Sequence, residues 1–93
     1  MKIEAVHNGY ELINDQGKRV GEITYSPASD DFVIADHTFV DPSLRGKGAG
    51  DDLLDHLVAE MDKQGKKIKA LCPFVVKRFN ENDKYDFINY DKQ

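Results

Sequence analysis

Several residue types are scarce in this sequence, and each shortage excludes a class of protein. There is one cysteine, Cys72, and no tryptophan in 93 residues. A single cysteine excludes an internal disulfide and a cysteine-based zinc site, and it fits a reducing compartment. No segment approaches the ~20 consecutive apolar residues of a membrane-spanning helix. The first residues also lack the apolar segment of a secretory signal. We therefore expect a cytoplasmic protein without a membrane partner.

Basic residues are too few and too dispersed for a protein that binds nucleic acid. The chain has 13 Lys and Arg against 17 Asp and Glu, which gives a formal net charge of −4. The cations alternate with acids instead of forming a basic stripe. We expect no nucleic-acid partner and one small globular domain over residues 1–93.

The first forty residues predict four antiparallel strands. Apolar-rich runs at 1–7 and 10–14 are separated by Asn8-Gly9, which is typical of a hairpin turn. Alternation of apolar and polar residues predicts a strand at 20–25. The run 32–40 is apolar on both faces and predicts a central strand buried on both sides.

The second half of the chain predicts two helices around one more strand. Apolar residues repeat at helical spacing within 49–64, and Gly65 is a suitable helix end. We predict a strand at 66–71, a short helix over 74–80 opened by Pro73, and one or two helical turns within 83–89. The fold class is therefore α+β, a mostly antiparallel sheet with one strand–helix–strand crossover.

The segment 44–50, LRGKGAG, places three glycines and two cations between a predicted strand and a predicted helix. Free amides at a helix N-terminus bind phosphate well. A P-loop requires Lys-Ser/Thr at its end, but Gly48 follows Lys47. The dinucleotide-binding fingerprint requires Gly-x-Gly-x-x-Gly, whereas these glycines are spaced two apart. A glycine-rich turn without a ligand is the structural alternative.

The segment 45–50 resembles the Arg/Gln-x-x-Gly-x-Gly/Ala loop of the GNAT acetyltransferases, and 38–44 resembles the strand that leads into it. Together with His37-Thr38-x-Val40, Cys72-Pro73-Phe74-Val75 and Tyr85, these motifs are similar to those of small YjdJ-type GNAT proteins. That group is related to the vertebrate N-acetyltransferase domain-containing proteins. The resemblance covers residues 31–88.

The resemblance implies a truncated GNAT fold without the N-terminal helices that build the acceptor site in longer relatives. It implies acetyl-CoA as cosubstrate, an unidentified amine as acceptor, and a pantetheine arm lying between two splayed strands. The implied cofactor-binding residues are Phe39, Val40, Arg45, Gly46, Lys47, Gly48, Ala49 and Gly50. Asp51 and Asp52 depart from the family pattern. Two carboxylates near a pyrophosphate predict modest, salt-sensitive affinity, which Arg45 and Lys47 offset.

Cys72 and His37 are the candidate catalytic residues. Cys72 precedes a predicted helix, where a thiol ionises more readily and becomes a better nucleophile, so it is a candidate carrier of the acetyl group. Its alternative is a small buried apolar residue. His37 is a candidate general base, or a core histidine held by a backbone partner.

Other side chains are weaker candidates. Tyr85 and Tyr90 resemble the tyrosine that protonates the leaving thiolate in many GNAT enzymes, or they pack the C-terminal segment. Lys77 and Arg78 would contact the adenosine phosphates, or they are ordinary exposed cations. Asp36 is a candidate base or a solvated carboxylate, and His7 and His56 are less favoured than His37.

Two functions from different classes follow. The first is an N-acetyltransferase that uses the loop as its cofactor cradle and works mainly by proximity. The second is a module that binds acetyl-CoA or CoA without turnover, as a sensor or adaptor. An exposed apolar patch in place of the absent helices would indicate a partner protein that completes the site. A protein-interaction module without any ligand is a third alternative, and it leaves the loop without a purpose.

Overall fold

Five strands form one sheet whose spatial order follows the sequence. The computed structural model describes residues 1–93 and contains the strands β1 (Lys2–Val6), β2 (Gly9–Ile13), β3 (Arg19–Pro27), β4 (Phe32–Val40) and β5 (Lys67–Ala70). Neighbouring strands from β1 to β4 are antiparallel, and β5 pairs with β4 in parallel. This confirms the predicted α+β class and strand order.

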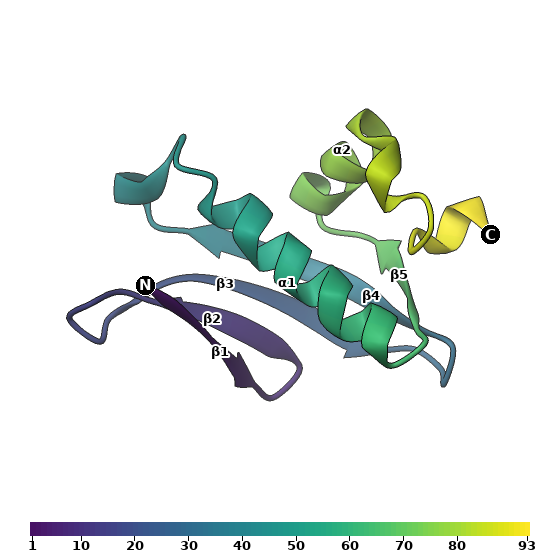
Figure 1. The fold of residues 1–93 in the computed structure, drawn as a ribbon, viewed down its shortest axis with the longest axis horizontal. Coiled ribbons are helices and arrows are strands. Elements are labelled where there is room, and N and C mark those ends of the chain that lie inside the picture. The colour runs from purple at the N-terminus through teal and green to yellow at the C-terminus, as the bar shows by residue number, and fades with distance from the viewer.

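Two helices complete the fold. Helix α1 (Ala49–Lys63) lies across the sheet and connects β4 to β5, and helix α2 (Pro73–Glu81) follows β5 beside it (Figure 1). Short 3-10 turns occupy Pro42–Leu44 (η1), Asp83–Tyr85 (η2) and Tyr90–Lys92 (η3). None of the helices is both long and apolar enough to span a lipid bilayer.

The hydrophobic core lies between α1 and the sheet. The predicted apolar face of α1 is confirmed, since Leu53, Leu54, Leu57, Val58 and Met61 are all buried. Each such side chain contributes roughly 1.5–3 kcal/mol by leaving water. From the other elements the largest fully buried side chains are Ile23, Val33, Ile68, Val75 and Ile88.

The prediction that β4 is buried on both faces was wrong, because only Val33 and Ala35 of this strand are buried. A bulge also divides the strand. Tyr25 pairs with Ala35 and Thr24 pairs with His37, so Asp36 is an extra residue without a partner. After an extra residue, side chains that would have pointed to one face of the sheet point to the other face. Ala35 is buried under the helices before the bulge, whereas His37 is exposed on the opposite face after it.

The predicted first hairpin is confirmed, but its turn lies one residue earlier. Val6 pairs with Gly9, so the two loop residues are His7 and Asn8, and Asn8 has a positive φ of 54°. Gly9 belongs to β2, where a Cβ atom would lie 2.7 Å from the carbonyl oxygen of Ile23. The glycine is therefore required by close approach of β3.

Strands β4 and β5 separate halfway along β4. Their pairing ends at Ala35 and Ala70, and the amides of Leu71 and Cys72 both donate to the carbonyl oxygen of Ala35. Beyond that point β4 continues to Val40 without β5 beside it. The edge of β4 that faces α2 is therefore open over its last residues.

Candidate active site

The glycine loop is held at its start by a short capped turn. The Asp41 carboxylate accepts a hydrogen bond from the Ser43 amide at 2.9 Å, and this bond lowers the pKa of Asp41. Pro42 begins η1 with its fixed φ. Leu44 at the end of η1 is buried in the core. The loop therefore leaves a fixed point and reaches α1 at Ala49, which is also buried.

Two glycines give the loop its shape. Gly46 and Gly48 have φ values of 77° and 78°, in the left-handed region that disfavours other residues. A Cβ atom at either position would meet nothing within 4 Å. The backbone here is consequently open to an incoming group.

Unpaired amides gather at the start of α1. Those of Gly46 and Gly48 donate no backbone hydrogen bond, and helical bonding begins only with the Asp52 amide, which donates to Gly48 at 2.9 Å. The amides of Ala49, Gly50 and Asp51 precede that bond, as the first donors of any helix do. The helix dipole adds about half a positive charge at the same place. These donors suit an anion.

The loop forms one wall of a cleft of about 550 Å³ between β4, α1 and α2. Phe74 and Arg78 from α2 form the opposite wall. The lining residues are Thr38, Val40, Leu44, Arg45, Gly46, Gly48, Ala49, Gly50, Asp51, Phe74 and Arg78. The cleft thus joins the open edge of β4 to the free amides of α1.

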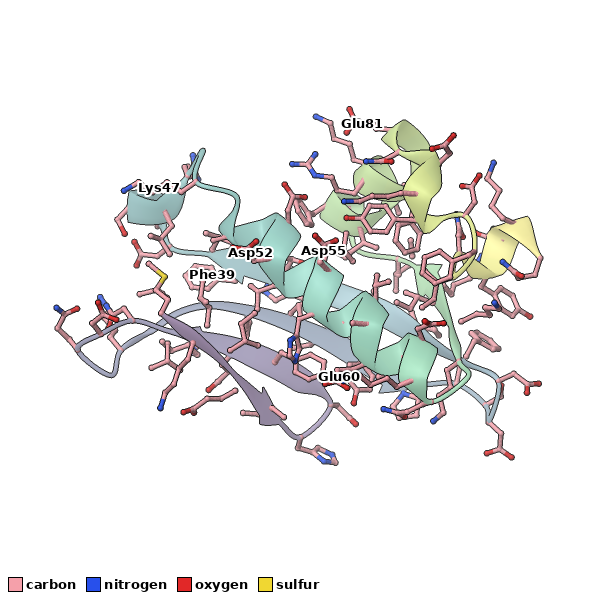
Figure 2. The ribbon with its side chains drawn as sticks, in the orientation of Figure 1. Phe39, Lys47, Asp52, Asp55, Glu60 and Glu81 are labelled. Carbon is pink, nitrogen blue, oxygen red and sulfur yellow. The ribbon has the colours of Figure 1, made fainter.

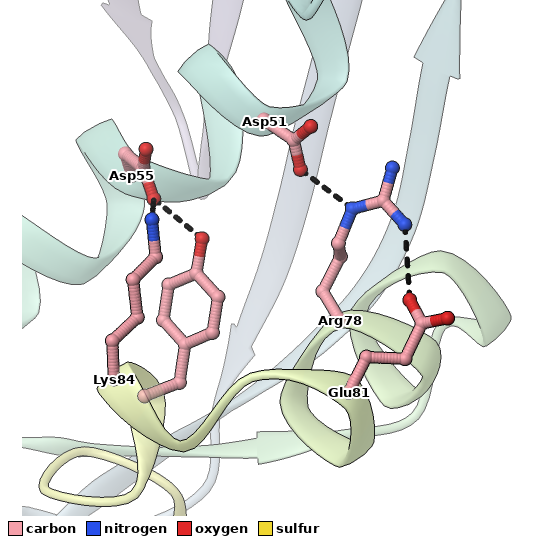
Figure 3. A network of polar contacts seen from close by, with 6 residues as sticks. Asp51, Asp55, Arg78, Glu81 and Lys84 are labelled. Carbon is pink, nitrogen blue, oxygen red and sulfur yellow. Dashed lines mark hydrogen bonds and ion pairs between the residues drawn. The ribbon is translucent and has the colours of Figure 1, made fainter.

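An ion pair crosses from α2 to the first turn of α1. The Nε atom of Arg78 donates to Oδ1 of Asp51 at 2.6 Å, and its Nη1 atom donates to Glu81 at 3.3 Å (Figure 3). The guanidinium also lies 4.8 Å from the centre of the Phe74 ring. The hydrogen bond from Arg78 to Asp51 raises the pKa of Arg78 further, so this cation stays charged in the cleft.

Cys72 lies behind the cleft wall. It is 4% exposed and occupies the N-cap position of α2. Its Sγ atom lies 3.5 Å from Oγ1 of Thr38, a residue that lines the cleft. The thiol therefore contacts a residue of the cleft lining but does not itself line the cleft.

His37 lies on the other face of the sheet from Cys72. The bulge places Thr38 on the helix side and leaves His37 exposed on the opposite side, and no hydrogen bond joins His37 to Cys72. Phe39 shares that face, is 38% exposed and lies 5.9 Å from the guanidinium of Arg19. The two candidate catalytic residues thus flank β4 from opposite sides.

The two candidate tyrosines form their side-chain contacts outside the cleft. The Tyr85 hydroxyl donates to Asp55 at 2.6 Å, and burial together with this carboxylate raises the pKa of Tyr85 (Figure 3). Tyr90 stacks on Phe32, with ring centres 4.0 Å apart. Neither residue lines the cleft, and both pack the C-terminal segment against the fold.

The remaining candidates also lie elsewhere. Asp36 accepts a hydrogen bond from the Ser26 hydroxyl at 2.6 Å, and His56 packs edge-on against Tyr10 with ring centres 4.7 Å apart. His7 is in the first hairpin turn and Lys77 is exposed on α2. Of these weaker candidates, only Arg78 reaches the cleft.

Most of the expected cofactor-binding residues do line the cleft, with two exceptions. Phe39 faces the other side of the sheet. Lys47 lies at the tip of the loop (Figure 2) and borders a separate hollow with Lys2 and His56, on the far side of α1. Sequence reasoning missed Phe74 and Asp51 as cleft residues, although Phe74 stood within the quoted Cys-Pro-Phe-Val motif.

The uncovered face of the sheet carries a row of charged side chains on its first three strands. Glu4 pairs with Glu11, and Glu11 pairs with Glu22, which places three carboxylates in one row across β1, β2 and β3. Arg19 lies 3.0 Å from Glu22 and 3.8 Å from Glu11. Like charges opposite each other destabilise a sheet, and Arg19 offsets that repulsion.

Comparison with known proteins shows the family of the chain. A family model described as GCN5-related N-acetyl-transferase matches residues 9–88. A GCN5-like candidate N-acetyltransferase from Staphylococcus aureus has 28% identity and a TM-score of 0.80, covering 95% of this chain and 86% of that protein. No match was found among curated proteins.

More distant solved structures share the fold. A Mycobacterium tuberculosis protein in complex with CoA has 21% identity and a TM-score of 0.61, over 69% of this chain and 40% of its own. An aminoglycoside 6'-N-acetyltransferase complexed with coenzyme A has 23% identity and a TM-score of 0.60, over 67% and 35%. Since the family model spans most of the sequence, the chain belongs to the GCN5-related N-acetyltransferase family.

Proposed function

We propose that this chain binds acetyl-CoA in the cleft and transfers its acetyl group to an amine acceptor. The main evidence for this proposal is the set of free amides at the start of α1. These amides and Arg78 belong to residues that line the same cleft. The family match and the CoA complexes of relatives support the same ligand.

The residues present fit a CoA phosphate group. The positive-φ glycines leave the loop amides uncovered, and a Cβ atom at either position would meet nothing within 4 Å. Arg45 and Arg78 supply positive charge at the lining. When bound, acetyl-CoA would supply an activated acetyl thioester, while the loop holds its phosphates.

The open edge of β4 would hold the amide-bearing arm of the ligand. The Asp41 amide donates to Val20 on β3, so by strand alternation the backbone groups of Val40 and Thr38 point toward the open edge. Both residues line the cleft. Extended amides pair well with such an edge, as an added strand does.

His37 is proposed as the general base for direct transfer. It takes the proton that the acceptor nitrogen loses while a nitrogen–carbon bond forms and the carbon–sulfur bond of the thioester breaks. The departing thiolate then receives a proton from solvent. Exposure of His37 on the uncovered face supports an acceptor that approaches from that side.

Transfer through Cys72 is the second route. The Cys72 sulfur would take the acetyl group as the bond to the CoA sulfur breaks, and the amine would then take it from Cys72 and restore the thiol. The N-cap position of Cys72 supports this route. It requires the Cys72 thiol to become accessible from the cleft, because Cys72 is buried and its sulfur contacts Thr38. The burial of Cys72 is therefore an obstacle to this second route.

The first test is an amide-resolved NMR titration with acetyl-CoA. We expect shifts in residues 45–51, in Thr38 and Val40, and in Phe74 and Arg78. The turn residue Gly65, at the opposite end of α1 from the loop, serves as a reference that should not shift. Absence of shifts at millimolar acetyl-CoA would overturn the binding proposal.

Turnover is tested with a panel of small amines and release of free CoA thiol as the readout. His37→Gln should reduce the rate at neutral pH while leaving acetyl-CoA affinity unchanged, because His37 lies outside the cleft. Cys72→Ala should retain transfer if the direct route holds. Loss of transfer in Cys72→Ala, together with an acetylated Cys72 in the unsubstituted protein, would favour the covalent route.

A binding module without turnover is the second candidate function. No helix covers the β1–β3 part of the sheet on its second face, so no element of residues 1–93 encloses an acceptor there. Acetyl-CoA binding without release of CoA for any amine would support a sensor or adaptor. The motifs around the glycine loop and Cys72 lead us to propose that the chain is one of the small YjdJ-type members of the family. The free, buried Cys72 supports a cytoplasmic location.

A further inference from the structure

We propose that Asp51 is a positioning residue that holds Arg78 in place for the phosphates of the ligand. The inference rests on the proposed function and concerns the same cleft. It also reverses the expectation that both acidic residues after Gly50 weaken binding. Asp51 and Asp52 are neighbours in sequence, yet their surroundings differ.

Three contacts fix the guanidinium of Arg78. Asp51 accepts from Nε at 2.6 Å, Glu81 accepts from Nη1 at 3.3 Å, and the Phe74 ring lies 4.8 Å from the guanidinium carbon. An arginine carries five N–H donors, and these two acceptors use only part of them. The remaining N–H donors are on Arg78 itself, and Arg78 lines the cleft. Arg78 therefore keeps hydrogen bonds available for phosphate.

Holding Arg78 in advance should strengthen binding. A free arginine side chain loses considerable rotamer freedom when it is ordered by a ligand, and a preordered one does not. Asp51 is well placed for this, since it projects from the first turn of α1 toward α2 (Figure 3). The same ion pair also fixes α2 against the end of α1 that carries the free amides.

Asp52 provides a matched comparison within the same helical turn. It borders the hollow on the far side of α1, next to Lys47 and His56, and it forms no ion pair. Both residues are aspartates in the first turn of α1, directly after the loop. If only repulsion acted, removing either carboxylate would improve the binding of a polyanion. If Asp51 positions Arg78, removing the Asp51 carboxylate should weaken the binding of the polyanion, whereas removing the Asp52 carboxylate should not.

The experiment measures the affinity of CoA and of pantetheine, which lacks the phosphates, by isothermal titration. Asp51→Asn should weaken CoA binding about tenfold, because a charge-assisted hydrogen bond to Arg78 is lost. Asp52→Asn should leave it unchanged or strengthen it roughly twofold, as expected for a screened charge. Pantetheine affinity should not change in either variant. Equal strengthening of CoA binding in both variants would overturn the positioning role.

A double-substitution cycle separates positioning from general destabilisation. In an Arg78→Ala background, Asp51→Asn should no longer weaken CoA binding and should behave as Asp52→Asn does. Asp51→Glu should restore part of the affinity. If Asp51→Asn weakens binding equally with and without Arg78, the inference is wrong. If the unsubstituted protein binds no CoA, the proposed function fails and this inference fails with it.

Discussion

Replacing Gly48 by alanine tests whether the loop backbone is a binding surface or only a turn. Gly48 has a φ of 78° and a Cβ atom there would meet nothing within 4 Å. The substitution therefore has no steric cost inside the protein, only the cost of a left-handed backbone, about 1 kcal/mol. The new methyl group would lie beside the amides of Gly48 and Ala49 and crowd a phosphate bound there, so CoA affinity should fall at least about tenfold.

Gly17→Ala is the matched control. Gly17 has a φ of 80°, also with open space around its Cβ position, but it lies in the turn between β2 and β3. Urea unfolding should give the same loss of stability, about 1 kcal/mol, for both variants. Isothermal titration should show weaker CoA binding only for Gly48→Ala. If Gly48→Ala binds CoA as tightly as Gly17→Ala does, the loop amides are not the phosphate site.

Three further predictions follow from other contacts. Burial raises the pKa of Tyr10 to about 12 from 10.0, so above pH 10 the unfolded chain loses a proton that the folded protein keeps. Stability should therefore fall as pH rises, with about 1.4 kcal/mol at pH 11 coming from Tyr10 alone. In urea unfolding Tyr10→Phe should remove that share, while Tyr85, whose pKa is also raised, keeps its own. Arg19→Ala should destabilise the protein by roughly 1 kcal/mol at low salt and less at high salt, because Glu11 and Glu22 lose their cation while Glu4 keeps its pairing with Lys2. Arg45→Ala should weaken CoA binding more than Lys47→Ala in the same titration, because only Arg45 lines the cleft.

The sequence determined the elements and their order through local rules. Apolar spacing gave the buried face of α1, Pro42 ended β4, and Pro73 began α2. The glycine pattern of residues 44–50 also located the loop, because positive φ at alternate positions restricts those positions to glycine. Each of these features depends on neighbours within a few residues.

The tertiary structure alone decided which side chains share the cleft. The bulge at Asp36 depends on register with β3, and that register sends His37 to the face opposite Cys72. Asp51 and Arg78 are 27 residues apart, and only the packing of α2 beside α1 brings them together. Local sequence patterns do not predict such long-range contacts, because strand register and helix packing depend on the whole core.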